Sequence, residues 1–358
     1  MNKLEFPYPE LLPANTRLKP LSGGHINGTW LLSAGGGPYA VLQRINPVVF
    51  RRPLEVTDNY LTIYRHLEKQ ADLGLRLPAP IPFSNGQFAY SDESGAAWRM
   101  TTFLDNTYAT EHADRAETAY EAALAAGRFL AGLEGLSPES VAPVIPGFHD
   151  SVKRWERFLE VERLATPEKQ AAAAPEIRFL YASHQLFDEI RALHLPQRVV
   201  HNDAKLANIL FDGATGKACA VIDWDTVMPG SALADFGDLV RSLAAEAPED
   251  AVNPERIAIK PDFFDALCRG FLKGAGEVLS RAEMDNLLQG AFWLTLEQAL
   301  RFLTDYLENN VYYPVQYPDH NLVRTRSQLA LFRQLKEQED RLHAILSARL
   351  PVNNRARL

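Results

Sequence analysis

The chain has 358 residues, of which 46% are hydrophobic and 23% charged, and its formal net charge is −8. These values are ordinary for a folded protein with a sizeable core, and the length suggests two domains or two lobes around a cleft. The acidic balance and the lack of a long lysine and arginine block argue against a nucleic-acid partner. Two isolated cysteines, Cys219 and Cys268, have no C-x-x-C spacing and indicate small buried residues in a reduced compartment.

The N-terminal segment MNKLEFPYPELLP contains no apolar signal-peptide core, and no stretch of the sequence is long enough to span a membrane. We therefore expect a soluble cytoplasmic protein with no membrane partner, either a monomer or a homodimer.

Residues 1–104 are predicted to form the first lobe, a small antiparallel sheet with one helix. Glycine-rich turns separate short strand-like runs over residues 15–45. A helix is predicted over residues 53–73 from apolar residues at helical spacing. A β-hairpin is predicted around Asn85-Gly86, followed by a strand over residues 97–104.

Residues 105–358 are predicted to form the second, mostly helical lobe, because alanine-rich helical sequence dominates from about residue 116 onward. Two short strands are expected around residues 207–223, and residues 165–176 are expected to be an exposed connection. The predicted fold class is therefore α+β, with the two-lobed arrangement of a protein kinase.

The segment HNDAKLANILFD carries the main chemical signal. Asp203 is followed five residues later by Asn208 and then by a strand, and a second strand ends on Asp223. Adjacent strands would bring Asn208 and Asp223 to one rim, where their oxygens suit Mg²⁺, while Asp203 is placed to accept a hydroxyl proton. This is the spacing of a kinase catalytic loop. A lone H-x-D with a later Asn is common, so the weight rests on the ordered set of glycine turn, helix, loop and second Asp.

The glycine turn LSGGHINGTW is predicted to contact ATP. Gly23 and Gly24 would let backbone N–H groups approach the phosphates closely, although a Gly-Gly pair in a hairpin is more often only a turn. His25 and Asn27 in the same turn could reach the transferred phosphate or the acceptor.

The strand lysine that contacts ATP phosphates in kinases has no direct counterpart. Gln43 or Arg44 occupies its position, and alternation along a strand allows only one of them to face the nucleotide. Arg44 could have Glu55 as its helical partner, or it could be an ordinary surface cation.

The segment TLEQALRFLTDYLENNVYYP is a candidate acceptor site. Arg301, Asp305 and Glu308 recur at near-helical spacing before a tyrosine-rich turn that includes Tyr312. An exposed helix face with ion pairs would give the same pattern. Aromatic rings that pack on the C–H face of a sugar, with polar groups for its hydroxyls, are the functional interpretation. Asp235, in ADFGDLVRS, is expected to brace the catalytic loop.

The motifs HNDAKLANILFD, VIDWDTVMPG and ADFGDLVRS resemble those of the aminoglycoside phosphotransferase/choline kinase superfamily. With GGHINGTW, VLQRIN and RFLTDYLENNVYYP, the chain looks closest to the N-acetylhexosamine 1-kinase group. The resemblance implies a reaction that passes the γ-phosphate of ATP to the anomeric hydroxyl of an N-acetylhexosamine, using Mg²⁺. It also implies that Asp203 is the catalytic base and contacts the acceptor, that Asn208 and Asp223 are the metal ligands, and that Arg301 contacts the sugar.

Two other functions remain open at this point. One is a kinase of another small alcohol, such as an aminoglycoside, homoserine or choline, although an arginine in the pocket disfavours a cationic substrate. The other is a nucleotide-binding module with weak or lost catalysis. The three polar residues of the predicted active site argue against it, and the missing strand lysine argues mildly for it.

Overall fold

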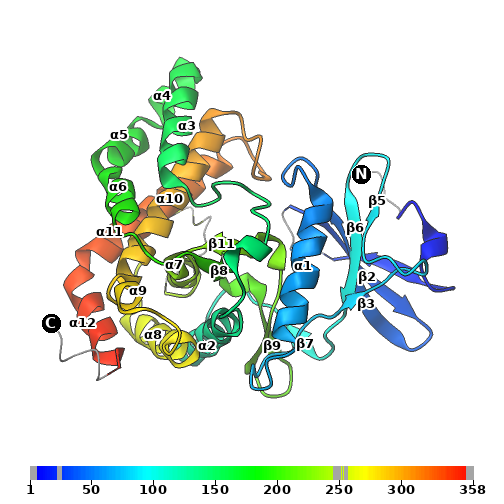
Figure 1. Ribbon diagram of the computed structural model, residues 1–358. Helices are drawn as coiled ribbons and strands as arrows, with labels where there is room; N and C mark the ends of the chain where they lie inside the picture. Colours follow the sequence, from blue (N-terminus) through cyan, green and yellow to red (C-terminus); the bar gives the residue numbers. More distant parts are fainter. Residues whose placement is uncertain (1–5, 22–25, 245–250, 252, 254–256, 352–358) are drawn as a thin grey trace.

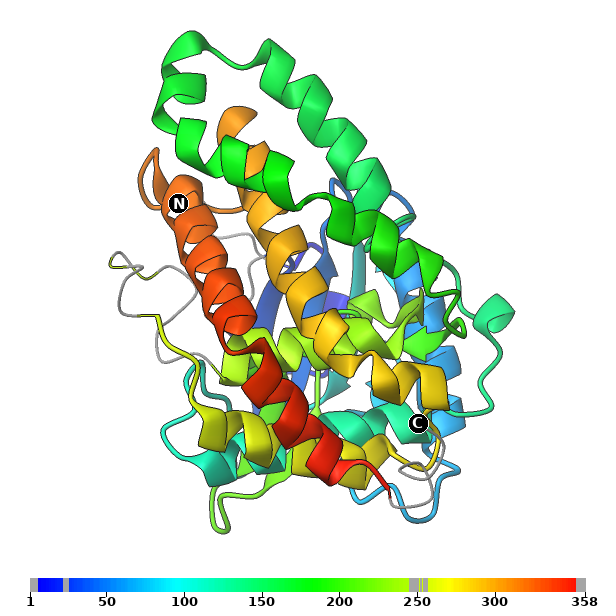
Figure 2. The same ribbon diagram turned by 90° about the vertical axis from the view of Figure 1, so that its left-hand side faces the viewer.

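The computed structural model describes residues 6–21, 26–244, 251, 253 and 257–351, and it has a β-sheet lobe and a larger helical lobe (Figure 1). The predicted α+β fold class, with an antiparallel sheet near the N-terminus and helices after it, is confirmed. Figure 2 shows the helical lobe from the side facing away from the sheet, with α3 to α6 at one end. Among the described residues, no helix is both long and apolar enough to cross a bilayer.

The N-terminal lobe is an antiparallel sheet in the order β1-β2-β3-β6-β4, with β5 paired to β6. Its strands are β1 Arg17–Pro20, β2 Gly28–Ala34, β3 Gly37–Ile45, β4 Pro80–Ile81, β5 Tyr90–Ser91 and β6 Ala97–Thr102. A short 3-10 helix, η1, spans Pro9–Leu11, and α1, the α-helix in the described part of this lobe, spans Pro53–Leu67. Figure 1 shows α1 between the sheet and the helical lobe.

Alternation along β3 and β6 gives the sheet two different faces. Leu42 and Trp98 point into a small core that belongs to the N-terminal lobe alone. Ile45 and Ala97 point the other way, into the large core that contains α1 and the helical lobe. A side chain on this second face therefore lies toward the junction of the two lobes.

The C-terminal lobe contains the remaining strands in two small sheets, of which one has the order β10-β9-β7 and the other pairs β11 with β8. These strands are β7 Thr107–Tyr108, β8 Arg198–Val200, β9 Ile209–Asp212, β10 Ala218–Val221 and β11 Met228–Gly230. The α-helices are α2 Ala116–Gly132, α3 Ser151–Leu164, α4 Pro167–Ala172, α5 Ala174–Ser183, α6 Gln185–Ala192, α7 Ala232–Leu243, α8 Pro261–Ala275, α9 Arg281–Asp285, α10 Leu287–Leu307, α11 His320–Glu337 and α12 Glu339–Arg349. Short 3-10 helices are η2 Pro138–Ser140, η3 Leu206–Asn208 and η4 Trp224–Thr226. The two strands expected around residues 207–223 are β9 and β10.

Helices α7 and α10 cross in direct backbone contact beneath the candidate site. A Cβ atom on Gly290 of α10 would lie 2.5 Å from the backbone oxygen of Leu233 in α7, so only glycine permits this approach. Both helices carry site residues, and the close crossing holds those residues at a fixed separation.

Three local predictions were wrong. Residues 165–176 are not an exposed connection, because Thr166 caps α4, Pro167 begins it and a second helix follows. The turn at Asn85-Gly86 exists, but β4 and β5 do not pair with each other, because both pair with β6, β4 at Met100 and Thr101 and β5 at Ala97 and Trp98. Helix α1 ends at Leu67 rather than at residue 73.

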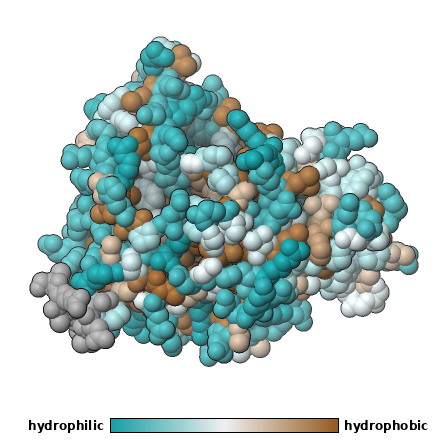
Figure 3. All heavy atoms as spheres, in the orientation of Figure 1, coloured by the Kyte–Doolittle hydropathy of each residue, from teal (hydrophilic) through white to brown (hydrophobic). Residues whose placement is uncertain are grey.

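The face of the molecule shown in Figure 3 is mostly hydrophilic, with apolar side chains scattered in small groups. The boundary placed after residue 104 stays a prediction. The last strand of the N-terminal sheet ends at Thr102, and β7, which begins at Thr107, pairs with β9 of the other lobe.

Candidate active site

The catalytic loop connects β8 to η3 and is braced from below by α7. The carboxylate of Asp235 accepts hydrogen bonds from the backbone N–H of His201 at 3.0 Å and of Asn202 at 2.8 Å. Asn202 has a left-handed backbone with φ of 61°, so these bonds stabilise a conformation that side chains seldom adopt. Burial raises the pKa of Asp235 to about 6. The expectation that Asp235 braces the loop agrees with these contacts.

Two side chains of the loop tie it to the segment that follows β10. The Asn202 amide donates to the backbone oxygens of Thr226 and Met228, at 3.0 and 3.2 Å. A ring nitrogen of His201 lies 2.9 Å from the backbone oxygen of Ile222. The loop carrying Asp203 and the turn carrying Asp223 are therefore held together by hydrogen bonds to backbone carbonyls.

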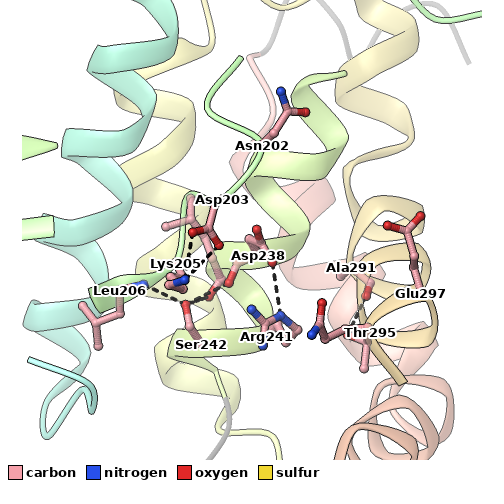
Figure 4. Close-up of polar contacts among 12 residues, drawn as sticks. Asn202, Asp203, Lys205, Leu206, Asp238, Arg241, Ser242, Ala291, Thr295 and Glu297 are labelled. Carbon is pink, nitrogen blue, oxygen red and sulfur yellow. Dashed lines mark hydrogen bonds and ion pairs between the residues drawn. The ribbon is translucent and has the colours of Figure 1, made fainter. Parts of the chain in front are cut away.

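Asp203 lies at the centre of the site and is kept ionised by its neighbours (Figure 4). The ammonium of Lys205 lies 2.8 Å from one carboxylate oxygen and 3.1 Å from the other. The Asn208 amide also donates to Asp203, at 3.0 Å. Burial acts to raise the pKa of Asp203, but the ammonium of Lys205 outweighs it and holds this pKa below its ordinary value.

Asn208 and Asp223 are brought to the same rim by the pairing of β9 with β10. The two strands are antiparallel, and the backbone N–H of Ile222 donates to the Asn208 carbonyl at 2.9 Å. Desolvation raises the pKa of Asp223 to about 6, with further contributions from Asp225 and Asp203. Several carboxylates lie close together here, and a bound cation would reduce the repulsion between their negative charges.

The residues present fit a magnesium ion that is shared with a nucleotide. The described residues hold no group of three or more His, Cys, Asp or Glu side chains suited to a metal. Mg²⁺ in kinases, however, takes one or two protein oxygens and completes its shell with phosphate and water. Asp223 supplies a carboxylate, and Asn208 has its amide nitrogen turned to Asp203, which leaves its oxygen for a ligand.

Helix α7 also supports the loop on the side of η3. The hydroxyl of Ser242 accepts from the backbone N–H of Leu206 at 3.0 Å and donates to the backbone oxygen of Asp238 at 2.8 Å. Asp238 is buried and pairs with Arg241 at 3.1 Å. Figure 4 shows this chain of contacts running from the loop to α7.

The glycine turn is only partly described. Gly23, Gly24 and His25 lie outside the described residues. Asn27 is described, and its amide donates to the Asp225 carboxylate while its oxygen accepts from the backbone N–H of Asn46 at 2.8 Å. Asn27 therefore joins the turn to the segment that follows Asp223, and its contact with an acceptor stays a prediction.

The register of β3 against β6 separates Gln43 from Arg44. Gln43 lies opposite Arg99 on the face toward the lobe junction, and its side-chain oxygen accepts from Arg99 at 3.1 and 2.8 Å. Arg44 lies on the other face, where it pairs with Asp92 at 3.2 Å. Glu55 pairs with Arg52 at 2.8 Å, not with Arg44. The cation that contacts Gln43 on the junction side of the sheet is Arg99, a residue that the sequence motif does not indicate.

Arg301 packs against an aromatic surface formed by Phe148, Tyr312 and Tyr313. Its guanidinium is 5.0 Å from the centre of the Phe148 ring and 5.7 Å from that of Tyr313. Tyr312 is 40% exposed and contacts Tyr313 edge to face. Asp305 is buried and accepts from the backbone N–H groups of both tyrosines, at 2.8 and 3.0 Å, so it shapes the turn.

The third acidic residue of this pattern, Glu308, forms an ion pair with Arg157 of α3 at the surface. Of the three charged residues at helical spacing, only Arg301 belongs to the aromatic surface.

A buried carboxylate, that of Glu297, lies near Arg301 and contacts two other basic side chains. Glu297 is fully buried, and its oxygens contact His149 at 2.7 Å and Arg154 at 3.6 Å. The other ring nitrogen of His149 lies 3.0 Å from the backbone oxygen of Asn202 in the catalytic loop. Burial acts to raise the pKa of Glu297, but His149, Arg154 and Arg301 lower it to about 2. Sequence reasoning missed this network, because no spacing connects residue 149 with residue 297.

A model of the phosphotransferase enzyme family matches residues 17–274. The chain belongs to this family. The resemblance to aminoglycoside phosphotransferases and choline kinases is confirmed at that level, and the chain is a phosphotransferase.

Several solved structures of kinases share the fold over nearly the whole chain. A microcompartment-associated aminopropanol kinase is 15% identical with a TM-score of 0.63, covering 94% of this chain and 96% of that chain. A choline/ethanolamine kinase family protein from Mesorhizobium loti is 18% identical with a TM-score of 0.56, covering 95% of each chain. Amicoumacin kinase, solved with AMP-PNP, Ca²⁺ and Ami, is 15% identical with a TM-score of 0.56, covering 92% of this chain and 90% of that chain. At these identities the likeness shows the fold, and the acceptor is a separate question.

Proposed function

We propose that this phosphotransferase transfers the γ-phosphoryl group of ATP, with Mg²⁺, to the anomeric hydroxyl of an N-acetylhexosamine such as N-acetylglucosamine or N-acetylgalactosamine. The observation that carries the choice of acceptor is Arg301, which lies between the rings of Phe148 and Tyr313. Aromatic rings suit the C–H face of a sugar, and a guanidinium can donate two hydrogen bonds to neighbouring hydroxyls or to an acetamido carbonyl.

The charge of this surface also favours a neutral acceptor. Arg301 and Arg154 share the buried Glu297, so that carboxylate is already committed to cations of the protein. An ammonium group brought to the same place would meet like charge without a free carboxylate to offset it. A sugar has no charge to repel.

The residues of the catalytic loop account for the transfer itself. Asp203 is ionised and lies where it can orient the acceptor hydroxyl and take its proton. Because phosphoryl transfer passes through a loose transition state, a weak but well-placed base is sufficient. Asn208 and Asp223 would hold Mg²⁺, which neutralises charge on the phosphates when it is bound.

A kinase of a small amino alcohol is the second candidate. Asp203 lies close enough to Asp238 to raise its pKa, and a second carboxylate near the base is what an ammonium-bearing acceptor would use. The similar structures of aminopropanol and choline/ethanolamine kinases give this alternative some weight. Against it stands the ion pair of Asp238 with Arg241, which occupies one carboxylate oxygen.

Measuring ADP release over a panel of acceptors separates these functions. The panel contains N-acetylglucosamine, N-acetylgalactosamine, glucose, choline, ethanolamine, aminopropanol, homoserine and an aminoglycoside, each with ATP and Mg²⁺. We expect the two acetamido sugars to give the highest kcat/KM. Preference for the amino alcohols would support the second candidate. Nucleotide binding without turnover of any acceptor would indicate a weakly catalytic binding module.

A further inference from the structure

Asp225 lies two residues after the proposed metal ligand Asp223. Both of its carboxylate oxygens accept hydrogen bonds from the N-terminal lobe. Arg99 of β6 donates to one carboxylate oxygen and the amide of Asn27 donates to the other. Arg99 and Asp225 are 2% and 3% exposed, so this ion pair is shielded from water and from screening by salt. It joins two segments that are 126 residues apart in sequence.

Each partner of Asp225 is itself held in place. Two contacts hold the Arg99 guanidinium in place. It donates twice to Gln43 of β3, and it lies 4.6 Å from the centre of the Tyr60 ring of α1. The oxygen of the Asn27 amide accepts from the backbone N–H of Asn46. Asp225 is therefore held by β6 of the sheet, through Arg99, and by Asn27 of the glycine turn.

Because Asp225 is close to Asp223 in the chain, the contacts that hold Asp225 also restrict the backbone at Asp223. Asp225 lies in η4, which begins directly after Asp223, and Asp223 has a left-handed backbone with φ of 63° and ψ of 57°. This conformation is uncommon for a residue with a side chain, although aspartate adopts it more readily than most, so contacts of the neighbouring residues help to hold it. Fixing Asp225 two residues later holds the turn, and with it the direction of the Asp223 carboxylate.

The arrangement differs from the kinase scheme, in which a lysine on the strand corresponding to β3 pairs with a glutamate on the adjacent helix. Here Gln43 occupies the position of the strand lysine. The cation is Arg99 on the neighbouring strand, and the anion is Asp225 in the turn that follows the proposed metal ligand. Tyr60 of α1 contributes an aromatic face to Arg99.

We propose that Asp225, held by Arg99 and Asn27, is a positioning residue that couples the nucleotide-facing side of the N-terminal lobe to the magnesium ligand Asp223. The proposal rests on the proposed ATP- and Mg²⁺-dependent function. It identifies the Arg99–Asp225 ion pair as a link between the lobes in a chain that lacks the strand lysine.

The first test is the variant Asp225→Asn, which keeps the shape of the side chain and removes its charge. We expect the Mg²⁺ concentration for half-maximal ATP binding to rise about tenfold or more, the range found when residues that orient metal ligands are changed. Nucleotide binding without Mg²⁺ should change little. Titrating ATP into the purified protein at several Mg²⁺ concentrations measures both. An unchanged Mg²⁺ dependence would overturn the proposal.

Asn27→Ala provides a second variant, because Asn27 is only half-buried and its loss leaves the Arg99 ion pair intact. We expect a smaller rise in the same Mg²⁺ requirement. Combined with Asp225→Asn, it should add less than the sum of the two effects, because both act through one carboxylate. Full additivity would mean that Asn27 and Asp225 act independently, and would also overturn the proposal.

Hydrogen exchange of the protein without nucleotide or metal gives a readout that does not depend on activity. The backbone N–H of Asn46 is bonded to Asn27, and that of Val227 to Trp224, so the two amides report on the two sides of the link. Asp225→Asn should speed exchange at both. Faster exchange at Val227 alone would show a local turn with no coupling between the lobes.

Arg198→Gln is the matched control. Arg198 also lies on a strand and pairs with a buried carboxylate, that of Glu283, at 2.8 Å. Its loss should lower the melting temperature, as loss of a buried ion-pair partner generally does, while leaving the Mg²⁺ requirement unchanged. If the wild-type protein itself shows no Mg²⁺-dependent ATP binding, the proposed function fails. If it does and Asp225→Asn retains that dependence, only the coupling fails.

Discussion

At the scale of single residues, Asp203 is proposed to act as a base although its pKa is low. A strong base needs a raised pKa, yet Lys205 holds the pKa of Asp203 below its ordinary value. The carboxylate is therefore ionised at any physiological pH. In the proposed function, it orients the hydroxyl and receives the proton late in the transfer. This suits phosphoryl transfer, in which positioning and charge stabilisation supply most of the catalysis.

Asp203→Asn should lower kcat about 10²- to 10⁴-fold while leaving ATP affinity nearly unchanged, because an amide cannot accept the proton. Steady-state kinetics together with a binding titration checks this. Asp188→Asn, which changes an exposed carboxylate paired with Arg191, is the control and should behave as wild type. A loss of kcat smaller than about tenfold would contradict the role given to Asp203.

Arg301→Ala should raise KM for the acetamido sugars about ten- to hundredfold and lower kcat much less than Asp203→Asn does. Leaving sugar groups without their hydrogen-bond partner costs about 1–3 kcal/mol of binding. KM for ATP should stay the same. Arg157→Ala, at the surface pair with Glu308, serves as the control. If KM is unchanged for every sugar in a folded Arg301→Ala protein, Arg301 is a structural residue of α10.

At the scale of elements, the sequence predicts features that depend on residues close together in the chain. It does not predict features that depend on how strands pair. The catalytic loop and β9 lie within one short stretch, so the spacing of Asp203 and Asn208 suffices to predict them. The choice between Gln43 and Arg44 needs the register of β3 against β6, which no local pattern contains. Arg99 escapes prediction for the same reason, because it becomes notable only when Gln43 and Asp225 are brought beside it.

Helix α10 carries a buried acid whose effect on stability should depend on pH. Glu297 has its pKa lowered from 4.5 to about 2, so its ionised form stabilises the fold above the ordinary pKa, and this stabilisation is lost as the pH falls from about 4.5 toward 2. Glu297→Gln should therefore destabilise the protein by about 3 kcal/mol at neutral pH, with a difference from wild type that shrinks across this range.

Denaturant unfolding of both proteins at a series of pH values measures this difference. Glu308→Gln, which removes a surface ion pair, should cost less than about 1 kcal/mol at any pH. A Glu297→Gln difference that stays constant from neutral pH to about pH 3 would show that the loss comes from packing and not from charge.

At the scale of the whole molecule, the two lobes meet through side chains that come from both. Tyr60 of α1 stacks on Trp224 of η4 at 4.7 Å between ring centres, and Arg99 reaches Asp225 in the same turn. The order of the elements was sufficient to predict the two-lobed fold. The contacts across the junction were not predictable, because they join residues far apart in sequence. The acceptor also stays a proposal, since it depends on a surface assembled from residues 148, 301 and 313.

The central claim, anomeric phosphorylation of an acetamido sugar, is tested most directly by identifying the product. The protein is incubated with ATP, Mg²⁺ and N-acetylglucosamine, and the product is examined by ³¹P NMR and by an assay for reducing sugar. We predict a sugar 1-phosphate formed in equal amount with ADP, with matching loss of the reducing end, and neither change with Asp203→Asn. A phosphorylated product that keeps its reducing end, or ADP formed without any sugar phosphate, would contradict the account.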